Sequence, residues 1–251
     1  MLSCPLEFQS NLNKDFGNDT DRLPFDEFLA LNRTRISKCV HLLAPRGSLI
    51  WFAIHHYVGF LQVMMYDAGL HYRRMNIWRY ENGFSRSQRT LRNEYEPFLW
   101  FSASNADWSF NVDDVRVPYK SVDRLKNPVY YRDGNGHRVA WKPNALGATR
   151  GDVWEFPTLA GKRFEHEKTG HPTQKPEALI SMILRAFTPK DSTGCYAGSV
   201  FDPFAGSGTV GVCAERLNRE GHKIRWLCCE LEQQWVDVSR ARVANVPAVL
   251  L

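Results

Sequence analysis

One segment near the end of the chain restricts the fold more than any other. Residues 199–243 alternate between apolar runs of strand length, a glycine-rich turn and amphipathic helical stretches. The pattern predicts strands at Ser199–Phe201 and Ile224–Cys229, and helices at Thr209–Leu217 and Trp235–Val243. This order predicts a right-handed parallel α/β unit, whose ligands bind beyond the carboxyl ends of the strands.

The preceding parts of the chain extend this pattern. Residues 25–43 place apolar side chains at helical spacing, and a Pro-Arg-Gly sequence at 45–47 ends the run. The continuous apolar run at 48–54 is typical of a strand covered on both faces in a parallel sheet. Further expected elements are a helix near 56–68, strands at 74–79 and 97–103, and a helix that begins at Pro176.

Residues 104–170 interrupt the pattern. The segment is irregular and rich in Asn, Asp, Gly, Trp and Tyr, with an expected hairpin turn at 132–136. A chain of 251 residues can bury one substantial core and carry an inserted lobe. We therefore predict one α/β domain in two halves, residues 1–103 and 171–251, with residues 104–170 as the insert.

The positive charge is concentrated in the middle of the chain. Residues 72–150 hold 14 Lys/Arg against 8 Asp/Glu, a net charge of +6, so the remainder of the chain is at −1. Such a concentration attracts a polyanion, and counterion release would make DNA binding depend on salt. On charge alone, a solvated basic face fits equally well.

Neither a metal site nor membrane attachment is expected. The six cysteines show no CxxC pair and no Cys/His ligand spacing, so we interpret them as reduced core thiols. His55, His56 and His137 have no acidic or cysteine partner at ligand spacing. No apolar run is long enough to span a bilayer and no signal sequence is recognisable, so we expect a cytoplasmic protein.

The turn at 201–209 carries the most specific chemistry. It is not a P-loop, because Thr209-Val210 follows Gly208 where Lys and Ser/Thr would be needed. Its glycines permit positive φ, and the helix after it offers N–H donors to a carboxylate, which suits the methionine end of S-adenosylmethionine. One strand later, Glu230 can accept both hydroxyls of a ribose. Together these features indicate a nucleoside cofactor.

Two segments and their order carry a resemblance to a known family. His171-Pro172-Thr173-Gln174-Lys175-Pro176 precedes Phe204-Ala205-Gly206-Ser207-Gly208, and the insert lies ahead of both. The chain thus resembles the β-class amino-methyltransferases of bacterial and phage restriction-modification systems, which methylate exocyclic amines in DNA. The resemblance implies a circularly permuted, Rossmann-like S-adenosylmethionine-dependent methyltransferase fold with an inserted target-recognition lobe.

The resemblance also implies roles for particular residues. Thr173 and Lys175 would lie near the methionine moiety, the 202–208 turn would hold the cofactor, and Glu230 would bind its ribose. The cofactor-binding residues expected in this way are His171, Thr173, Lys175, Asp202, Pro203, Phe204, Ala205, Gly206, Ser207, Gly208 and Glu230.

The expected reaction is direct methyl transfer to a flipped-out base in double-stranded DNA. Segments 111–119 and 151–154 look like those of adenine-modifying members, which favours adenine N6 over cytosine N4. Ser3 argues for cytosine N4. The chain departs from the family in its catalytic motif, D/S/N-P-P-Y/F/W, which would supply acceptors for the amine hydrogens and an aromatic ring for the base.

The expected place of that motif holds Ser3-Cys4-Pro5-Leu6, our candidate catalytic residues. Ser3 and Pro5 could match the motif whereas Cys4 and Leu6 do not, and a register that makes Phe8 the stacking ring remains open. Because only two residues precede Ser3, we expect the sheet to be short on one edge. Either the gene product begins upstream of Met1, or this is a diverged copy whose sheet edge a partner covers.

Candidate DNA contacts are Arg86, Arg89 and Arg92, between two predicted strands, and Lys142 in the insert. Aromatic residues of the insert are more often the core of such a lobe than a stacking platform. Two rival functions remain: a non-catalytic DNA- or cofactor-binding paralogue that pairs with an active subunit, and an RNA methyltransferase of the same fold. A homodimer is a further alternative for the assembly.

Overall fold

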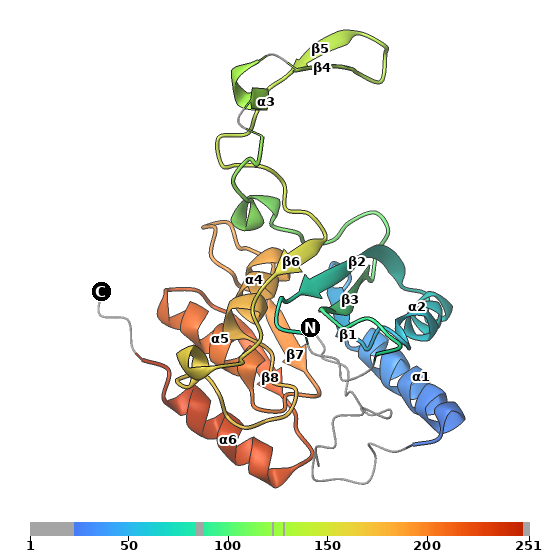
Figure 1. Cartoon of the computed structure of the whole chain (residues 1–251), viewed down its shortest axis with the longest axis vertical. Coiled ribbons are helices and arrows are strands. Elements are labelled where there is room, and N and C mark those ends of the chain that lie inside the picture. Colours follow the sequence, from blue (N-terminus) through green and yellow to red (C-terminus); the bar gives the residue numbers. More distant parts are fainter. Residues whose placement is uncertain (1–22, 84–87, 122, 128, 248–251) are drawn as a thin grey trace.

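The computed structural model describes residues 23–83, 88–121, 123–127 and 129–247. Figure 1 shows a two-part body from which a narrow lobe extends. The elements in chain order are α1 (Phe25–His41), β1 (Ser48–Phe52), α2 (Val58–Asp67), β2 (His71–Arg79), β3 (Tyr95–Ser102), η2 (Val112–Val115), α3 (Asp123–Lys126), β4 (Val129–Arg132), β5 (Arg138–Trp141), β6 (Val153–Glu155), η3 (Lys162–Phe164), α4 (Glu177–Phe187), β7 (Ser199–Asp202), α5 (Thr209–Arg219), β8 (Arg225–Cys228) and α6 (Gln233–Ala244).

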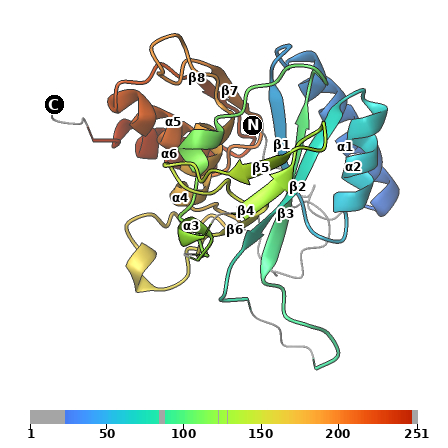
Figure 2. The ribbon, with the colours of Figure 1, turned by 90° about the horizontal axis from the view of Figure 1, so that it is seen from above.

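The first part of the body is a four-stranded sheet in the order β1-β3-β2-β6. The β3 strand is antiparallel to both β1 and β2, and β6 is parallel to β2. In Figure 2, α1 and α2 cover one face of this sheet, and α4 and α5 lie on its other side. The expected α/β architecture is therefore present, with a mixed rather than an all-parallel sheet.

The apolar run of β1 reflects burial on both faces. Leu49 and Trp51 pack against α1 and α2, whereas Ile50 and Phe52 pack into the core that α4 and α5 share. Its partner in the described part of the chain is β3, and the pairing is antiparallel. The expectation that this strand lies in a parallel sheet was wrong for the β1–β3 pair, because a run of apolar residues indicates burial on both faces and does not specify strand direction.

The second part of the body is built on β7 and β8, which pair in parallel as the sequence predicts. Among the described residues, no ladder joins this pair to the four-stranded sheet. The expectation of a single sheet with one short edge therefore differs from the two sheets that the described strands form. Contact between the two parts comes from side chains, including the rings of Trp51 and Phe204, whose centroids are 6.1 Å apart.

The other predicted elements are confirmed within a few residues of their ends, including α1, α2, β2, β3, α5 and α6. The predicted first helical residue of α4, Pro176, is instead its N-cap. Its ψ of 136° is extended, so the helix begins at Glu177. The hairpin expected around 132–136 is also present, as β4 and β5.

The insert consists of a projecting lobe and a root. A bridge between Val117 and Ala148 closes the base of the lobe, which Figure 1 shows reaching away from the body to the β4–β5 hairpin. The flanking parts pack on the body, because Val115 and Trp154 belong to the same core as Leu179. The β6 strand continues the main sheet beyond β2.

Polar side chains fix the root of the lobe to the end of α4. The Asn111 amide donates to the carbonyls of Arg185 (2.8 Å) and Thr188 (2.7 Å), where the helix leaves acceptors unpaired. Asp114 accepts hydrogen bonds from Lys190 Nζ and from the Tyr196 hydroxyl, each within 2.7 Å. Burial and this carboxylate raise the pKa of Tyr196, which stays a neutral donor. The lobe is thus anchored to the half of the body that holds the glycine turn.

Among the described cysteines, two are buried as expected, Cys195 and Cys228 are half-buried, and one departs clearly from the expectation of a core thiol. Cys39 and Cys213 are buried thiols as expected, and burial raises the pKa of Cys213 to about 12. Cys229 is exposed, because it follows the last residue of β8. Within the described ranges, no His, Cys, Asp and Glu side chains gather as a metal-binding group, and no helix there is long and apolar enough to cross a membrane.

We predict that Asn111→Ala lowers the free energy of unfolding by about 1 to 3 kcal/mol, because two part-buried carbonyl groups, of Arg185 in α4 and of its C-cap Thr188, lose their side-chain donor. Urea denaturation monitored by circular dichroism measures the change. Asn135→Ala at the exposed hairpin tip is the matched control and should have no effect. Equal stabilities of the two variants would contradict the anchoring role.

Candidate functional site

The turn between β7 and α5 requires its two glycines. Gly206 and Gly208 have φ of +50° and +77°. A β-carbon on Gly206 would lie 2.7 Å from His171 Nε2, and one on Gly208 would lie 2.6 Å from Ser239 Cβ and 3.0 Å from its Cα. Any side chain at either position therefore combines backbone strain with a collision. These constraints bring the backbone of the turn close to α6 and to the segment before α4.

Hydrogen bonds join the turn to the end of β8. Asp202 is buried, with 2% of its surface exposed, and Oδ1 accepts the Phe204 N–H at 3.1 Å. The Ala205 N–H donates to the Cys229 carbonyl (2.9 Å), and the Cys229 N–H donates to the Asp202 carbonyl (2.8 Å). The carboxyl ends of two parallel strands thus form one rigid edge, where ligands of open α/β sheets bind.

Glu230 lies directly beyond this edge and turns its carboxylate onto the glycine turn. Oε2 accepts the Gly206 N–H at 2.7 Å, and Oε1 accepts the N–H groups of Leu231 (2.8 Å) and Glu232 (3.0 Å). A carboxylate offers about four lone-pair sites. Three are used, so Glu230 retains acceptor capacity for one hydroxyl without any rearrangement, and for a second if one N–H bond breaks.

His171 lies against the glycine turn at Gly206. Its ring packs edge-on against Trp235, with centroids 4.6 Å apart, and Nδ1 accepts the Thr173 N–H at 3.3 Å. Burial, followed by the charge of Lys175, lowers the pKa of His171 to about 4 against the opposing effect of Glu230. The ring is therefore neutral at pH 7, and because Nδ1 accepts, Nε2 carries the proton.

Lys175 connects this site with the four-stranded sheet. Its Nζ lies 3.1 Å from Glu96 Oε2 and over the ring faces of Phe52 and Trp78, at 5.3 and 5.8 Å from their centroids. Only 10% of the lysine side chain is exposed. The charge of Lys175 is therefore satisfied by a carboxylate of β3 and aromatic rings of the neighbouring strands, which ties the two parts of the body together.

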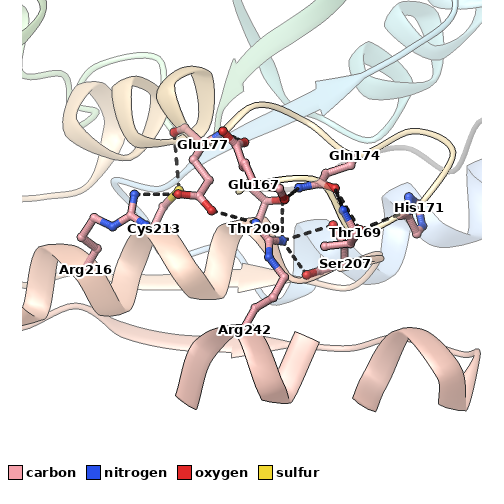
Figure 3. Close-up of polar contacts among 10 residues, drawn as sticks. All are labelled: Glu167, Thr169, His171, Gln174, Glu177, Ser207, Thr209, Cys213, Arg216 and Arg242. Atoms are coloured by element: carbon pink, nitrogen blue, oxygen red, sulfur yellow. Dashed lines mark hydrogen bonds and ion pairs between the residues drawn. The ribbon is translucent and has the colours of Figure 1, made fainter. Parts of the chain in front are cut away.

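A network of polar side chains from α4, α5 and α6 contacts the end of the glycine turn (Figure 3). Arg242 Nη1 donates to the Ser207 carbonyl (2.7 Å) and lies 3.2 Å from Thr209 Oγ1, while Nη2 pairs with Glu177 Oε1 at 2.8 Å. Glu177 also pairs with Arg216 at 2.6 Å. One guanidinium on α6 thus links the last residues of the turn to the first residue of α4.

The segment before α4 joins the same network. Gln174 accepts hydrogen bonds from the backbone and hydroxyl of Thr169 and donates to the Glu167 carbonyl at 2.8 Å. The Glu167 carboxylate accepts the Glu177 N–H at 2.6 Å, which satisfies a free donor at the start of α4. Burial raises the pKa of Glu167. These bonds fix the 171–175 segment, and with it His171, beside the glycine turn.

Sequence reasoning did not identify Trp235, Ser239 and Arg242 as parts of the site. They are four and three residues apart, so they lie on one face of α6, and this face meets the turn. The helical spacing was visible in the sequence. The spacing did not single out Ser239 and Arg242 on this face, because their partners belong to other elements.

The structure brings most of the predicted cofactor-binding residues together and separates the predicted DNA contacts. The 202–208 turn, His171 and Glu230 meet at the ends of β7 and β8, whereas Lys175 extends away toward Glu96. Arg89 and Arg92 lie in the β2–β3 connection, where Arg92 pairs with Glu94, and Lys142 follows β5 in the lobe. Outside the described residues lie Ser3, Cys4, Pro5, Leu6 and Arg86.

Comparison with solved structures identifies the fold. A crystal structure of M1.HpyAVI in complex with SAM covers 88% of this chain and 85% of its own, with a TM-score of 0.61 and 22% identity. A putative DNA modification methylase of Thermus thermophilus, solved with S-adenosyl-L-methionine, covers 99% and 86%, with a TM-score of 0.56 and 16% identity. The fold is that of the S-adenosylmethionine-dependent methyltransferases, as the sequence predicts.

The chain belongs to the DNA methylase family of N6 and N4 type, which matches residues 10–241. Type II methyltransferase M1.MboII of Moraxella bovis is 32% identical over 84% of this chain and 78% of its own length. M.HpaI of Haemophilus parainfluenzae is 28% identical over 93% of the chain. The chain spans only 65% of the length of M.HpaI. The family resemblance drawn from the two sequence segments is thereby confirmed.

The pKa of His171 predicts a pH dependence of stability. Its folded-state value near 4 lies below the ordinary 6.5, so the unfolded chain binds an additional proton between those values. Stability should therefore fall by up to about 3 kcal/mol from this residue as the pH decreases from 7 to 4. Urea denaturation measures the free energy of unfolding across this pH range, and it should decrease less steeply in His171→Asn than in the wild-type chain. Equal pH dependence in both would contradict the lowered pKa of His171.

Arg242→Met should lower the free energy of unfolding by about 3 kcal/mol, because it breaks a largely buried ion pair and removes the donors to the turn. Arg240→Met changes an exposed arginine of the same helix and should cost less than about 0.5 kcal/mol. Parallel denaturation of both variants measures the difference. If Arg242→Met were as stable as the control, the network would not support the turn.

Proposed function

We propose that this protein transfers a methyl group from S-adenosylmethionine to an exocyclic amine in double-stranded DNA, at a defined sequence and within a restriction-modification system. The observation that carries the proposal is the junction of the glycine turn with His171 and Glu230, at the carboxyl ends of β7 and β8. Family membership supports the same reaction. The chain acts, in this proposal, on DNA in the cytoplasm.

The chemistry of the site fits this cofactor. The first N–H groups of α5 lack intrahelical acceptors and suit a carboxylate, and the remaining acceptor capacity of Glu230 suits a ribose hydroxyl. The Trp235 indole N–H is buried beside His171 without an acceptor among the described residues. A polar ligand at this place would satisfy it. We assign cofactor binding to the turn, His171, Thr173 and Glu230.

The electrostatics of the 171–175 segment also suit a cationic ligand. His171 is neutral at pH 7 because of its lowered pKa, and the charge of Lys175 is paired with Glu96. Neither basic residue therefore places an uncompensated positive charge beside a sulfonium. In this arrangement the role of Lys175 is to position the segment, and the 202–208 turn holds the ligand.

When bound, S-adenosylmethionine supplies a methyl group on a positively charged sulfur. The chain must accept hydrogen bonds from the N–H groups of the amine, because the conjugated lone pair makes this amine a poor nucleophile. We assign this task to residues 3–6, where the Ser3 hydroxyl and a following carbonyl are acceptors. Leu6 supplies no aromatic stacking, so the flipped base needs a ring from another position, such as Phe8.

Adenine N6 is the proposed acceptor, with cytosine N4 as the alternative. The preference comes from the resemblance of segments 111–119 and 151–154 to adenine-modifying enzymes. In the structure, Asn111 and Asp114 anchor the lobe and Trp154 lies in the core. These residues thus build the root of the recognition lobe, so analysis of the methylated base must decide between the two acceptors.

Calorimetry with S-adenosylmethionine tests the cofactor site on the purified chain. We expect micromolar binding, and a loss of about 10- to 100-fold in Gly206→Val, because the new side chain would collide with His171. Gly151→Val is the matched control, since a β-carbon there meets no atom within 4 Å. A folded wild-type chain without measurable affinity would contradict the proposal.

Transfer of a labelled methyl group to duplex DNA, followed by nucleoside analysis, then tests the reaction. N6-methyladenine would support the proposal as stated, and N4-methylcytosine would correct the acceptor. Cofactor binding without transfer would favour the non-catalytic paralogue that pairs with an active subunit. Transfer to RNA in preference to duplex DNA would favour the RNA enzyme.

A further inference from the structure

The β4–β5 hairpin has two chemically different faces. Arg132 lies directly opposite Arg138 across the strands, and Tyr130 lies two residues before Arg132, so all three side chains share one face. The residues of the other face are Val129, Tyr131, Val139 and Trp141. Figure 1 shows the hairpin at the far end of the lobe, remote from both sheets.

The arginine pair is unfavourable for the hairpin itself. Like charges directly opposite each other destabilise a ladder, and an isolated two-stranded hairpin is marginal even without them. Arg138 stacks on the Tyr130 ring at 4.0 Å, and Arg132 donates to the Gly136 carbonyl at 2.8 Å. In the described part of the chain, no carboxylate forms an ion pair with either guanidinium. The face therefore carries two charges that an anionic partner would compensate.

The opposite face of the hairpin contacts the rest of the lobe at its base, through Trp141. Trp141 packs edge-on against Tyr119, with ring centroids 5.7 Å apart. The Tyr119 hydroxyl accepts the Asn144 N–H at 2.7 Å, which fixes the chain just beyond β5. Trp141 is thus engaged with the lobe, whereas Arg132 and Arg138 on the other face are both exposed.

The tip of the hairpin is preformed. Asp133 Oδ1 accepts the N–H groups of Asn135 and His137, each at 2.9 Å, and Gly136 adopts a φ of +81°. A side chain thus closes the turn without help from a ligand. Binding through this element would order few additional backbone bonds, which reduces the entropic cost of association.

The lobe also carries most of the net charge of the protein. Residues 117–149 hold six Lys/Arg and two Asp/Glu, a net charge of +4 out of +5 for the whole chain. Charge complementarity therefore favours a polyanion as the partner of this surface. The major groove of B-DNA, about 12 Å wide, admits a two-stranded β-ribbon.

We propose that the β4–β5 hairpin is the DNA-reading ribbon of this protein, with Arg132 and Arg138 directed at base edges in the major groove. The inference rests on the proposed function for its partner, duplex DNA, and adds the element and residues that select sequence. An arginine fork donates two hydrogen bonds to a guanine edge, so guanine is expected at the positions read. Lys142, beyond the ribbon, contacts a phosphate.

Selection of bound duplexes from a random-sequence pool, followed by sequencing, tests this assignment on the whole chain without requiring methyl transfer. The substitutions Arg132→Lys and Arg138→Lys keep the positive charge but remove the planar guanidinium that can donate two parallel hydrogen bonds. Each variant should reduce the preference for at least one guanine by about tenfold while total binding to the pool changes little. Arg225→Lys, at an exposed arginine of β8, is the matched control and should select the wild-type sequence.

Salt titration separates base reading from phosphate contact. Lys142→Ala should weaken binding to all sequences alike and reduce the salt slope by about 1. Uniform weakening by the Arg132 and Arg138 variants, or an unchanged selected sequence in both, would overturn the inference and leave the proposed function standing. A wild-type chain that binds no duplex would overturn both.

Discussion

The close approach of His171 to Gly206 is the contact on which the candidate site depends. The ring occupies the space of a β-carbon, so the turn can carry only glycine at this position. This approach also places the Gly206 N–H where Glu230 accepts it. Burial beside the turn keeps the imidazole neutral, so His171 carries no positive charge that would repel a cationic ligand. Packing, backbone conformation and electrostatics at the site thus follow from one pair of residues.

The remaining framework holds this pair in place from two directions. Arg242 connects the end of the turn with Glu177 at the start of α4, so that α4, α5 and α6 are joined at one point. Lys175 extends to Glu96 in the four-stranded sheet and is enclosed by aromatic rings. Since removal of one partner from a buried ion pair is strongly destabilising, these pairs make the two parts of the body depend on each other.

The inserted lobe combines a root fixed by hydrogen bonds with an exposed end. Asn111 and Asp114 bind groups at the end of α4 and just after it, which places the base of the lobe relative to the glycine turn. The far end carries Arg132 and Arg138 directly opposite each other, and their like charges disfavour the hairpin ladder. A duplex held at the ribbon would therefore have a defined orientation relative to the cofactor site, because the connection between them is fixed by hydrogen bonds at the root.

The sequence by itself determined the local elements and the turn. Periodicity and the two glycines are properties of neighbouring residues, so they predicted β7, α5, β8 and α6 within a few residues. The 171–176 and 204–208 segments also identified the family, which the comparisons confirm. Tertiary structure alone decided the antiparallel partner of β1, the pairing of Lys175 with Glu96 and the pairing of Arg242 with Glu177. The physical reason is that these contacts join residues from 46 to 79 positions apart, and no periodicity or local spacing specifies which distant side chains will meet.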